Sequence, residues 1–132
     1  MIKPDRSYSV SIILPILNEI NSLKKTIKIL NRIKVKKEYL VIYSKKLTNK
    51  LVKNELIKLK KRNKTLNYYP QSRPFVGGAI DSGIKYTKNK FIVIMASDLE
   101  TNPHELKNMI KKSQKNPNFI ISADRWISKK GF

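Results

Sequence analysis

Two acidic residues follow an apolar run near the middle of a chain that is otherwise poor in acid. The run covers residues 91–95, and Asp98 and Glu100 come shortly after it. On an extended segment, side chains two positions apart point the same way, so both carboxylates would face one direction. Mg²⁺ or Mn²⁺ needs only one or two such carboxylates when other oxygens complete its coordination shell. The pattern predicts a divalent-cation site. In the alternative, Asp98 or Thr101 caps a helix that Pro103 begins.

The elements that would position these carboxylates follow from two alternating hydrophobic patterns. Short apolar runs, rich in β-branched and aromatic residues, predict strands at 9–16, 39–43, 66–69, 91–95 and 119–122. Apolar residues at three- and four-residue steps predict helices at 19–33, 48–61, 77–86 and 103–113. The strands are apolar throughout, which is typical of a parallel sheet with helices on both faces. We expect one α/β unit, doubly wound.

Ligands of doubly wound sheets bind outside the carboxyl ends of the strands. The segments at those ends are 15–19, 43–46, 71–78, 96–100 and 124–126. In the third of them Gly77 and Gly78 open a helix, and Arg73 lies just before it. Free amides and the dipole at a helix start attract phosphate. The glycines would alternatively allow close packing of the helix on the sheet. Their spacing fits neither the Walker loop nor the dinucleotide-binding fingerprint.

The composition limits the class of protein and the range of partners. A chain of 132 residues makes one domain, and its lack of cysteine excludes disulfide scaffolds and thiolate metal sites. The net charge of +20 favours a polyanion partner such as nucleic acid, an anionic bilayer or a phosphorylated substrate. Solvated helix faces and an AT-rich coding bias would also produce this lysine content. No segment resembles a signal peptide or a membrane span. We therefore expect a cytoplasmic protein that meets a membrane only at its surface.

Three sequence blocks occur in order across nearly the whole chain: SIILPILNE, VGGAIDSGIKYTKNKFIVIMASDLETNPHEL and FIISADRWISKKGF. The first joins a strand to Pro-x-x-Asn-Glu. The second joins a glycine-rich helix start, a strand, an Asp-x-Asp-like motif and a proline-led helix, and the third is a strand ending in Asp-Arg. Together they resemble the family 2 glycosyltransferases, in particular the dolichyl-phosphate mannosyltransferase-like branch. The resemblance implies a Rossmann-like GT-A fold. It also implies one domain over residues 1–132, truncated at its carboxyl end relative to the family.

The same resemblance implies an activity and its residues. A sugar would pass from a nucleotide-diphosphate sugar to a lipid-phosphate or glycan acceptor, as in cell envelope glycan biosynthesis. Asp98 and Glu100 would hold Mg²⁺ or Mn²⁺, which stabilises charge on the departing diphosphate. Arg125 would clamp phosphate, or would simply pair with Asp124. No general base is identified. The implied nucleotide-sugar-binding residues are Pro15, Glu19, Tyr43, Ser44, Arg73, Gly77, Gly78 and Ser97.

The chain departs from the family pattern at several of these places. Ala96 occupies the position of the first aspartate, and Leu17 stands where tyrosine is common. Tyr43 and Ser44 replace acidic residues that usually contact the nucleotide base. These departures favour an alternative function, a catalytically impaired module that binds a nucleotide sugar or another protein. A nucleic-acid-binding function rests on charge alone and is not expected.

Glu19 and the single histidine each have two interpretations. The resemblance implies that Glu19 accepts hydrogen bonds from the base or ribose of the donor. In the alternative, Asn18 caps the following helix and Glu19 interacts with its dipole. His104 has no partner histidine or cysteine nearby in the sequence, so we expect it at the surface.

Overall fold

Strands and helices alternate along residues 9–97 and 102–116, the part of the chain that the computed structural model describes. Within these residues no helix has both the length and the apolar character needed to cross a membrane. The elements, in chain order, are β1 (Ser9–Pro15), α1 (Ile20–Asn31), β2 (Lys36–Tyr43), α2 (Lys50–Arg62), β3 (Leu66–Pro70), α3 (Phe75–Lys85), β4 (Phe91–Ile94), the 3₁₀ turn η1 (Pro103–Glu105) and α4 (Leu106–Lys115).

The four strands form one parallel sheet in the order β3-β2-β1-β4. The chain proceeds outward from β1 to β3, and then α3 carries it back to β4 on the other side of β1. Winding therefore reverses between β1 and β4, which is the switch point at which such sheets bind ligands. This arrangement confirms the predicted doubly wound α/β fold. The predicted strand at 119–122 lies outside the described residues.

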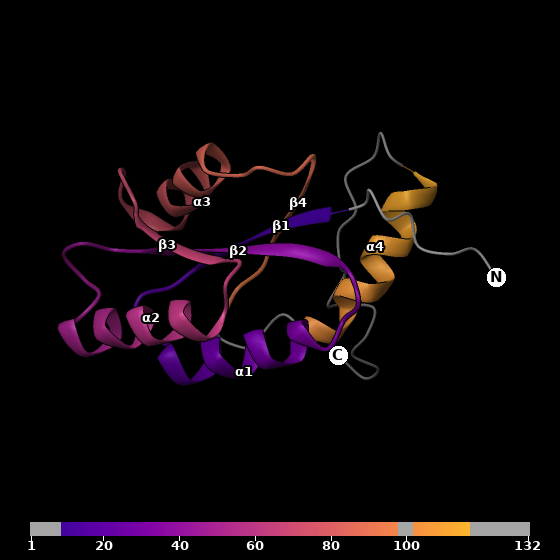
Figure 1. The fold of residues 1–132 in the computed structure, drawn as a ribbon. Coiled ribbons are helices and arrows are strands. Elements are labelled where there is room, and N and C mark those ends of the chain that lie inside the picture. The colour runs from indigo at the N-terminus through magenta and orange to yellow at the C-terminus, as the bar shows by residue number, and fades with distance from the viewer. Residues whose placement is uncertain (1–8, 98–101, 117–132) are drawn as a thin grey trace, which may run out of the picture.

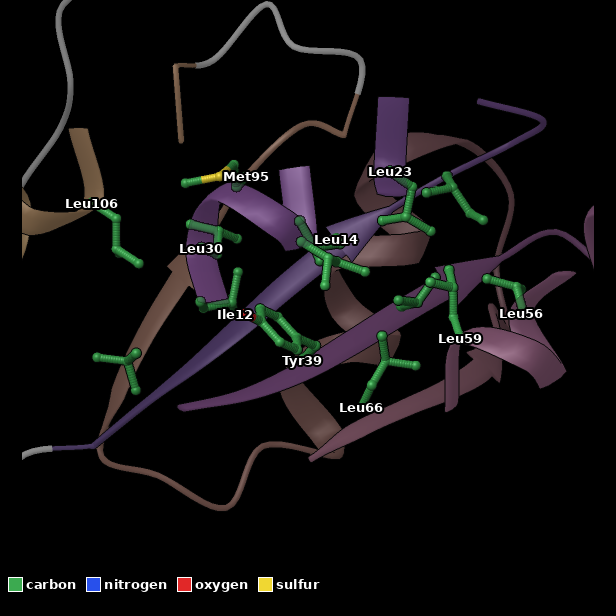
Figure 2. Close-up of a cluster of buried hydrophobic side chains, with 14 of the residues drawn as sticks. Ile12, Leu14, Leu23, Leu30, Tyr39, Leu56, Leu59, Leu66, Met95 and Leu106 are labelled. Atoms are coloured by element: carbon green, nitrogen blue, oxygen red, sulfur yellow. The ribbon is translucent and has the colours of Figure 1, made fainter. Parts of the chain in front are cut away.

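Helices cover both faces of the sheet, as predicted (Figure 1). One face packs against α1, α2 and α4, with Leu14, Leu23 and Leu56 among the fully buried side chains (Figure 2). The other face packs against α3, where Ala79 forms a smaller cluster with Ile13, Leu40 and Ile42 of the central strands. Burying these apolar side chains is the main source of stability.

Strand β2 begins at Lys36, three residues before the start that the apolar pattern predicts. The charged stretch from Lys36 to Glu38 contains no apolar run, yet it pairs with Ser9 to Ser11 of β1. Glu38 is only 9% exposed. Its Oε2 accepts hydrogen bonds from Ser11 Oγ at 2.6 Å and from the Lys88 amide at 2.9 Å. The parallel partner strand and this hydrogen bonding extend β2, and both depend on residues far along the chain.

Two helix starts also differ from their predicted positions. Helix α3 begins at Phe75 rather than Gly77, with Pro74 in extended conformation at its N-cap. The last predicted helix begins with a 3₁₀ turn before α4, and proline occupies its first position as expected. Asn102 is the cap of this turn, since its side chain accepts a hydrogen bond from the His104 amide at 3.0 Å. The N-cap position of this turn thus belongs to Asn102, whereas Asp98 and Thr101, named in the capping alternative, lie outside the described residues.

The buried Glu38 network provides a test of the fold. Replacing Glu38 with alanine should lower the free energy of unfolding by about 2 kcal/mol, because the buried donor on Ser11 and the part-buried donors on residues 88–89 lose their acceptor. Urea denaturation measures this loss. Alanine at the exposed Glu105 is the control, with an expected change within about 0.5 kcal/mol. Equal midpoints for the two variants would contradict a stabilising role for the network.

Candidate functional site

The segments that follow the strands are joined by backbone hydrogen bonds along the carboxyl edge of the sheet. The Ile16 amide donates to the Ile42 carbonyl at 2.9 Å, and the Gln71 amide donates to the Tyr43 carbonyl at 2.8 Å. The Met95 amide donates to the Ile13 carbonyl at 3.0 Å. Four of the five predicted ligand-binding segments thus begin side by side, on neighbouring strands. The fifth, 124–126, lies outside the described residues.

Ser97 links the end of β4 to the end of β1, at the switch point. Its side chain is 1% exposed, and its Oγ donates a hydrogen bond to the Pro15 carbonyl at 3.2 Å. This bond holds the segment just before Asp98 against the β1–α1 loop. Asp98, Glu100 and Arg125 themselves lie outside the described residues. Within residues 9–97 and 102–116, no three acidic, histidine or cysteine side chains gather as a metal site.

Glu19 stabilises the loop between β1 and α1 through its side chain. One carboxylate oxygen, Oε1, accepts hydrogen bonds from the amides of Leu17 and Asn18, at 2.9 and 2.8 Å. The carboxylate is therefore turned back over its own loop. Leu17, at the position where the family commonly has tyrosine, is 45% exposed at this edge.

Asn18 connects two of the loops instead of capping α1. Glu19 occupies the N-cap position, which corrects the alternative interpretation of Asn18. The Asn18 side chain accepts from the Asn49 amide at 2.8 Å and donates to the Leu47 carbonyl at 3.1 Å. Asn49 in turn caps α2 through the Val52 amide at 2.9 Å. The sequence analysis did not predict the link from Asn18 to the loop before α2. The Asn49 cap could have been predicted, because Asn49 lies three residues before Val52, an apolar position of the helix.

Tyr43 and Ser44, at the end of β2, are both engaged by neighbouring groups. The Tyr43 ring packs near the Tyr68 ring, with centroids 6.2 Å apart, and Lys53 Nζ lies 5.9 Å from its centroid. Ser44 is buried, and its Oγ accepts a hydrogen bond from the Leu47 amide at 3.1 Å. These contacts fix the turn that leads into α2.

Arg73 and the two glycines follow β3, at the start of α3. Arg73 and Gly77 are exposed, whereas Gly78 is buried because the Arg73 backbone crosses directly over it. Gln71 holds this turn through hydrogen bonds from Nε2 to the carbonyls of Arg73 (2.7 Å) and Phe75 (3.1 Å). Phe75 has a φ of 66°, which a residue other than glycine seldom adopts. Such unusual backbone tends to occur at functional segments.

The strand order sets how far apart these groups lie. Arg73 follows β3, which is separated from β4 by two strands. At about 4.8 Å per strand, the Arg73 segment and the Ser97 segment start roughly 14 Å apart. Pro15 and Glu19 lie between them, beside Tyr43 and Ser44. The candidate residues thus form a row along the edge, with the loops of β1 and β2 in its centre.

The Asn18 link yields a testable expectation. Replacing Asn18 with alanine removes both hydrogen bonds between the two central loops, each worth about 1 kcal/mol. We expect a ligand held by these loops to bind about tenfold more weakly, while the melting temperature falls by roughly 7 °C. Calorimetric titration and thermal unfolding measure the two effects. Alanine at the exposed Asn54 of α2 is a matched control and should change neither.

Comparisons with known proteins agree with this architecture. The family model "Glycosyl transferase family 2" matches residues 11–132. A sequence search of curated proteins finds no match. Among solved structures, the mannosyltransferase PcManGT from Pyrobaculum calidifontis, in complex with GDP-Man and Mn²⁺, superposes with a TM-score of 0.68 at 18% identity. The match covers 85% of this chain and 34% of that one, so the chain spans about a third of its length. At this identity the likeness concerns the fold.

Proposed function

Because the chain belongs to glycosyl transferase family 2, we propose that it transfers a sugar from a nucleotide-diphosphate sugar to a lipid-phosphate or glycan acceptor. The observation that carries this proposal is the row of loops at the switch point of a GT-A-like sheet. It is the place where a doubly wound sheet binds its ligand. We further propose that the protein acts in the cytoplasm, in cell envelope glycan synthesis.

The order of the strands suggests how the donor lies. We place the nucleoside over the loops of β1 and β2, where Pro15, Glu19, Tyr43 and Ser44 are gathered. The diphosphate then points toward β4 and Ser97. Arg73 and the start of α3 lie beyond β2, on the nucleoside side of the row. Their predicted phosphate-binding role therefore requires a donor that extends along the whole edge.

We propose that Asp98 and Glu100 hold Mg²⁺ or Mn²⁺ beside the diphosphate. When bound, the cation stabilises the negative charge that develops on the leaving phosphate oxygens. The hydrogen bond from Ser97 to Pro15 supports this placement, because it brings the chain into position one residue before Asp98. The Mn²⁺ and GDP-Man in the complex of PcManGT are consistent with it. Arg125 remains a proposed phosphate clamp.

A lipid phosphate is the acceptor that best suits these residues. A hydroxyl acceptor must lose a proton, which requires a general base within hydrogen-bonding distance. Glu19, a carboxylate within the row, already accepts two backbone hydrogen bonds through Oε1. A phosphate acceptor is ionised at neutral pH and needs no base. We therefore place a lipid phosphate ahead of a glycan hydroxyl.

The second candidate function is a module that binds a nucleotide sugar without transferring it. Ala96, exposed at the end of β4, has no carboxylate to add to Asp98 and Glu100. Leu17 likewise offers no hydroxyl at the exposed tip of its loop. Both departures lie at the proposed donor site.

Titration of the full chain with GDP-mannose and UDP-glucose, with and without Mn²⁺, distinguishes these functions. Mn²⁺-dependent binding followed by hydrolysis or transfer would support the enzyme. Binding without turnover would support the module. If neither donor binds under either condition, the proposed donor site is wrong.

A further inference from the structure

The outer surface of α2 exposes apolar side chains among its lysines. Val52, Leu56 and Leu59 form the buried stripe of the helix. At 100° per residue, the opposite side carries Lys50, Leu51, Asn54, Ile57, Lys58 and Lys61. Leu51 is 70% exposed and Ile57 is 44% exposed. We call these six residues, together with Lys45, Lys46 and Leu47 of the preceding loop, the α2 surface.

Basic charge is distributed unevenly between the two faces of the sheet. Helices α1, α2 and α4 together carry thirteen lysines and arginines and a single acid, Glu55. Helix α3, on the opposite face, carries one lysine and one aspartate, whose side chains form an ion pair at 3.4 Å. The first three helices thus have a net charge of +12 over 35 residues, whereas α3 has none over 11 residues. The α1, α2 and α4 side therefore has a positive field suited to an extended anionic surface.

The α2 surface adjoins the proposed donor site. Its loop follows β2, and α2 starts at the same sheet edge as the candidate residues. The Asn18 side chain binds the Leu47 carbonyl at 3.1 Å, so the exposed Leu47 lies beside the β1–α1 loop. A partner that covers Leu47 and Leu51 would thus come close to the edge where the sugar is transferred.

We propose that the α2 surface docks the protein onto an anionic lipid surface. Lysines there contact lipid phosphates, while Leu47, Leu51 and Ile57 enter the boundary between headgroups and acyl chains. Exposed leucines distinguish this partner from nucleic acid, whose phosphate backbone offers them no apolar contact. The docking explains how a lipid-phosphate acceptor reaches the site, and in that respect it rests on the proposed function.

Flotation of the full chain with vesicles tests this inference. Vesicles of phosphatidylcholine mixed with phosphatidylglycerol should bind the protein, and pure phosphatidylcholine should not. Serine at both Leu47 and Leu51 is expected to weaken binding about tenfold. Serine at both Lys50 and Lys61 should weaken it about 25-fold, at roughly fivefold per lysine. All four side chains are exposed, so the fold should be retained.

Matched variants on the other elements serve as controls. Serine at Val76 and Ile84, exposed at 66% and 47% on α3, should leave vesicle binding unchanged. Serine at Lys88 and Lys90, which precede β4, should change it less than twofold. Equal losses in test and control variants would show binding by overall charge and would overturn the proposal. So would unchanged vesicle binding after the double leucine substitution.

Two further measurements separate this inference from its alternatives. Tighter binding to polyuridine than to the mixed vesicles, lost in the same variants, would identify a nucleic-acid partner and overturn the proposal. Donor affinity without vesicles should be the same for wild type and the double leucine variant. If wild type binds no donor, the proposed function fails, whereas the vesicle result still decides the docking surface.

Discussion

Replacing Asp98 with asparagine should lower sugar transfer by about 1,000-fold, because several kcal/mol of charge stabilisation by the cation would be lost. Asparagine keeps the size of the side chain and removes its negative charge. The affinity for donor in the presence of Mn²⁺ should fall toward the value measured without metal. Radiolabelled sugar transfer and calorimetric titration with and without Mn²⁺ measure the two effects.

A second carboxylate provides the control for this substitution. Asp81 lies on α3, where it is paired with Lys85 at 3.4 Å, and it is only partly buried. Asparagine at this position removes the same charge from α3 and should leave transfer within about twofold of wild type, as for an ordinary surface substitution. Transfer that persists with Mn²⁺ in the Asp98→Asn variant would contradict the assignment of Asp98 as a metal ligand.

Replacing Gly78 with alanine should destabilise the protein by about 3 kcal/mol, a fall in melting temperature of roughly 10 °C. A Cβ at this position would lie 2.5 Å from the Arg73 carbonyl carbon and closer still to its oxygen. Because the obstacle is backbone, the turn from β3 into α3 must move. That turn carries Arg73 and is held by Gln71, so donor binding should weaken as well.

The neighbouring glycine is the control. A Cβ on Gly77 would have no atom within 4 Å, and alanine favours the helix by up to about 1 kcal/mol over glycine. Gly77→Ala should therefore keep or raise the melting temperature. If both variants unfold at the same temperature, the close approach of the Arg73 backbone does not account for the glycine at position 78.

The same glycines show which features the local sequence predicts and which only the folded structure reveals. Their sequence position predicted a helix start with phosphate-binding or packing glycines, and α3 indeed begins nearby. Only the folded chain distinguishes their roles. Gly77 borders open space, Gly78 lies under the Arg73 backbone, and Gly83 allows α3 to approach Ile13, whose Cγ2 would be 2.6 Å from an added Cβ.

The sequence by itself determined the alternation of strands and helices, the parallel sheet and the edge at which the candidate residues gather. These features depend on hydrophobic periodicity and chain order, which are local properties. The tertiary structure decided the early start of β2 around Glu38, the link from Asn18 to the β2–α2 loop and the order of the candidate residues along the edge. Each of these depends on partners tens of residues away. Such contacts form only when the strands pair, so no local pattern encodes them.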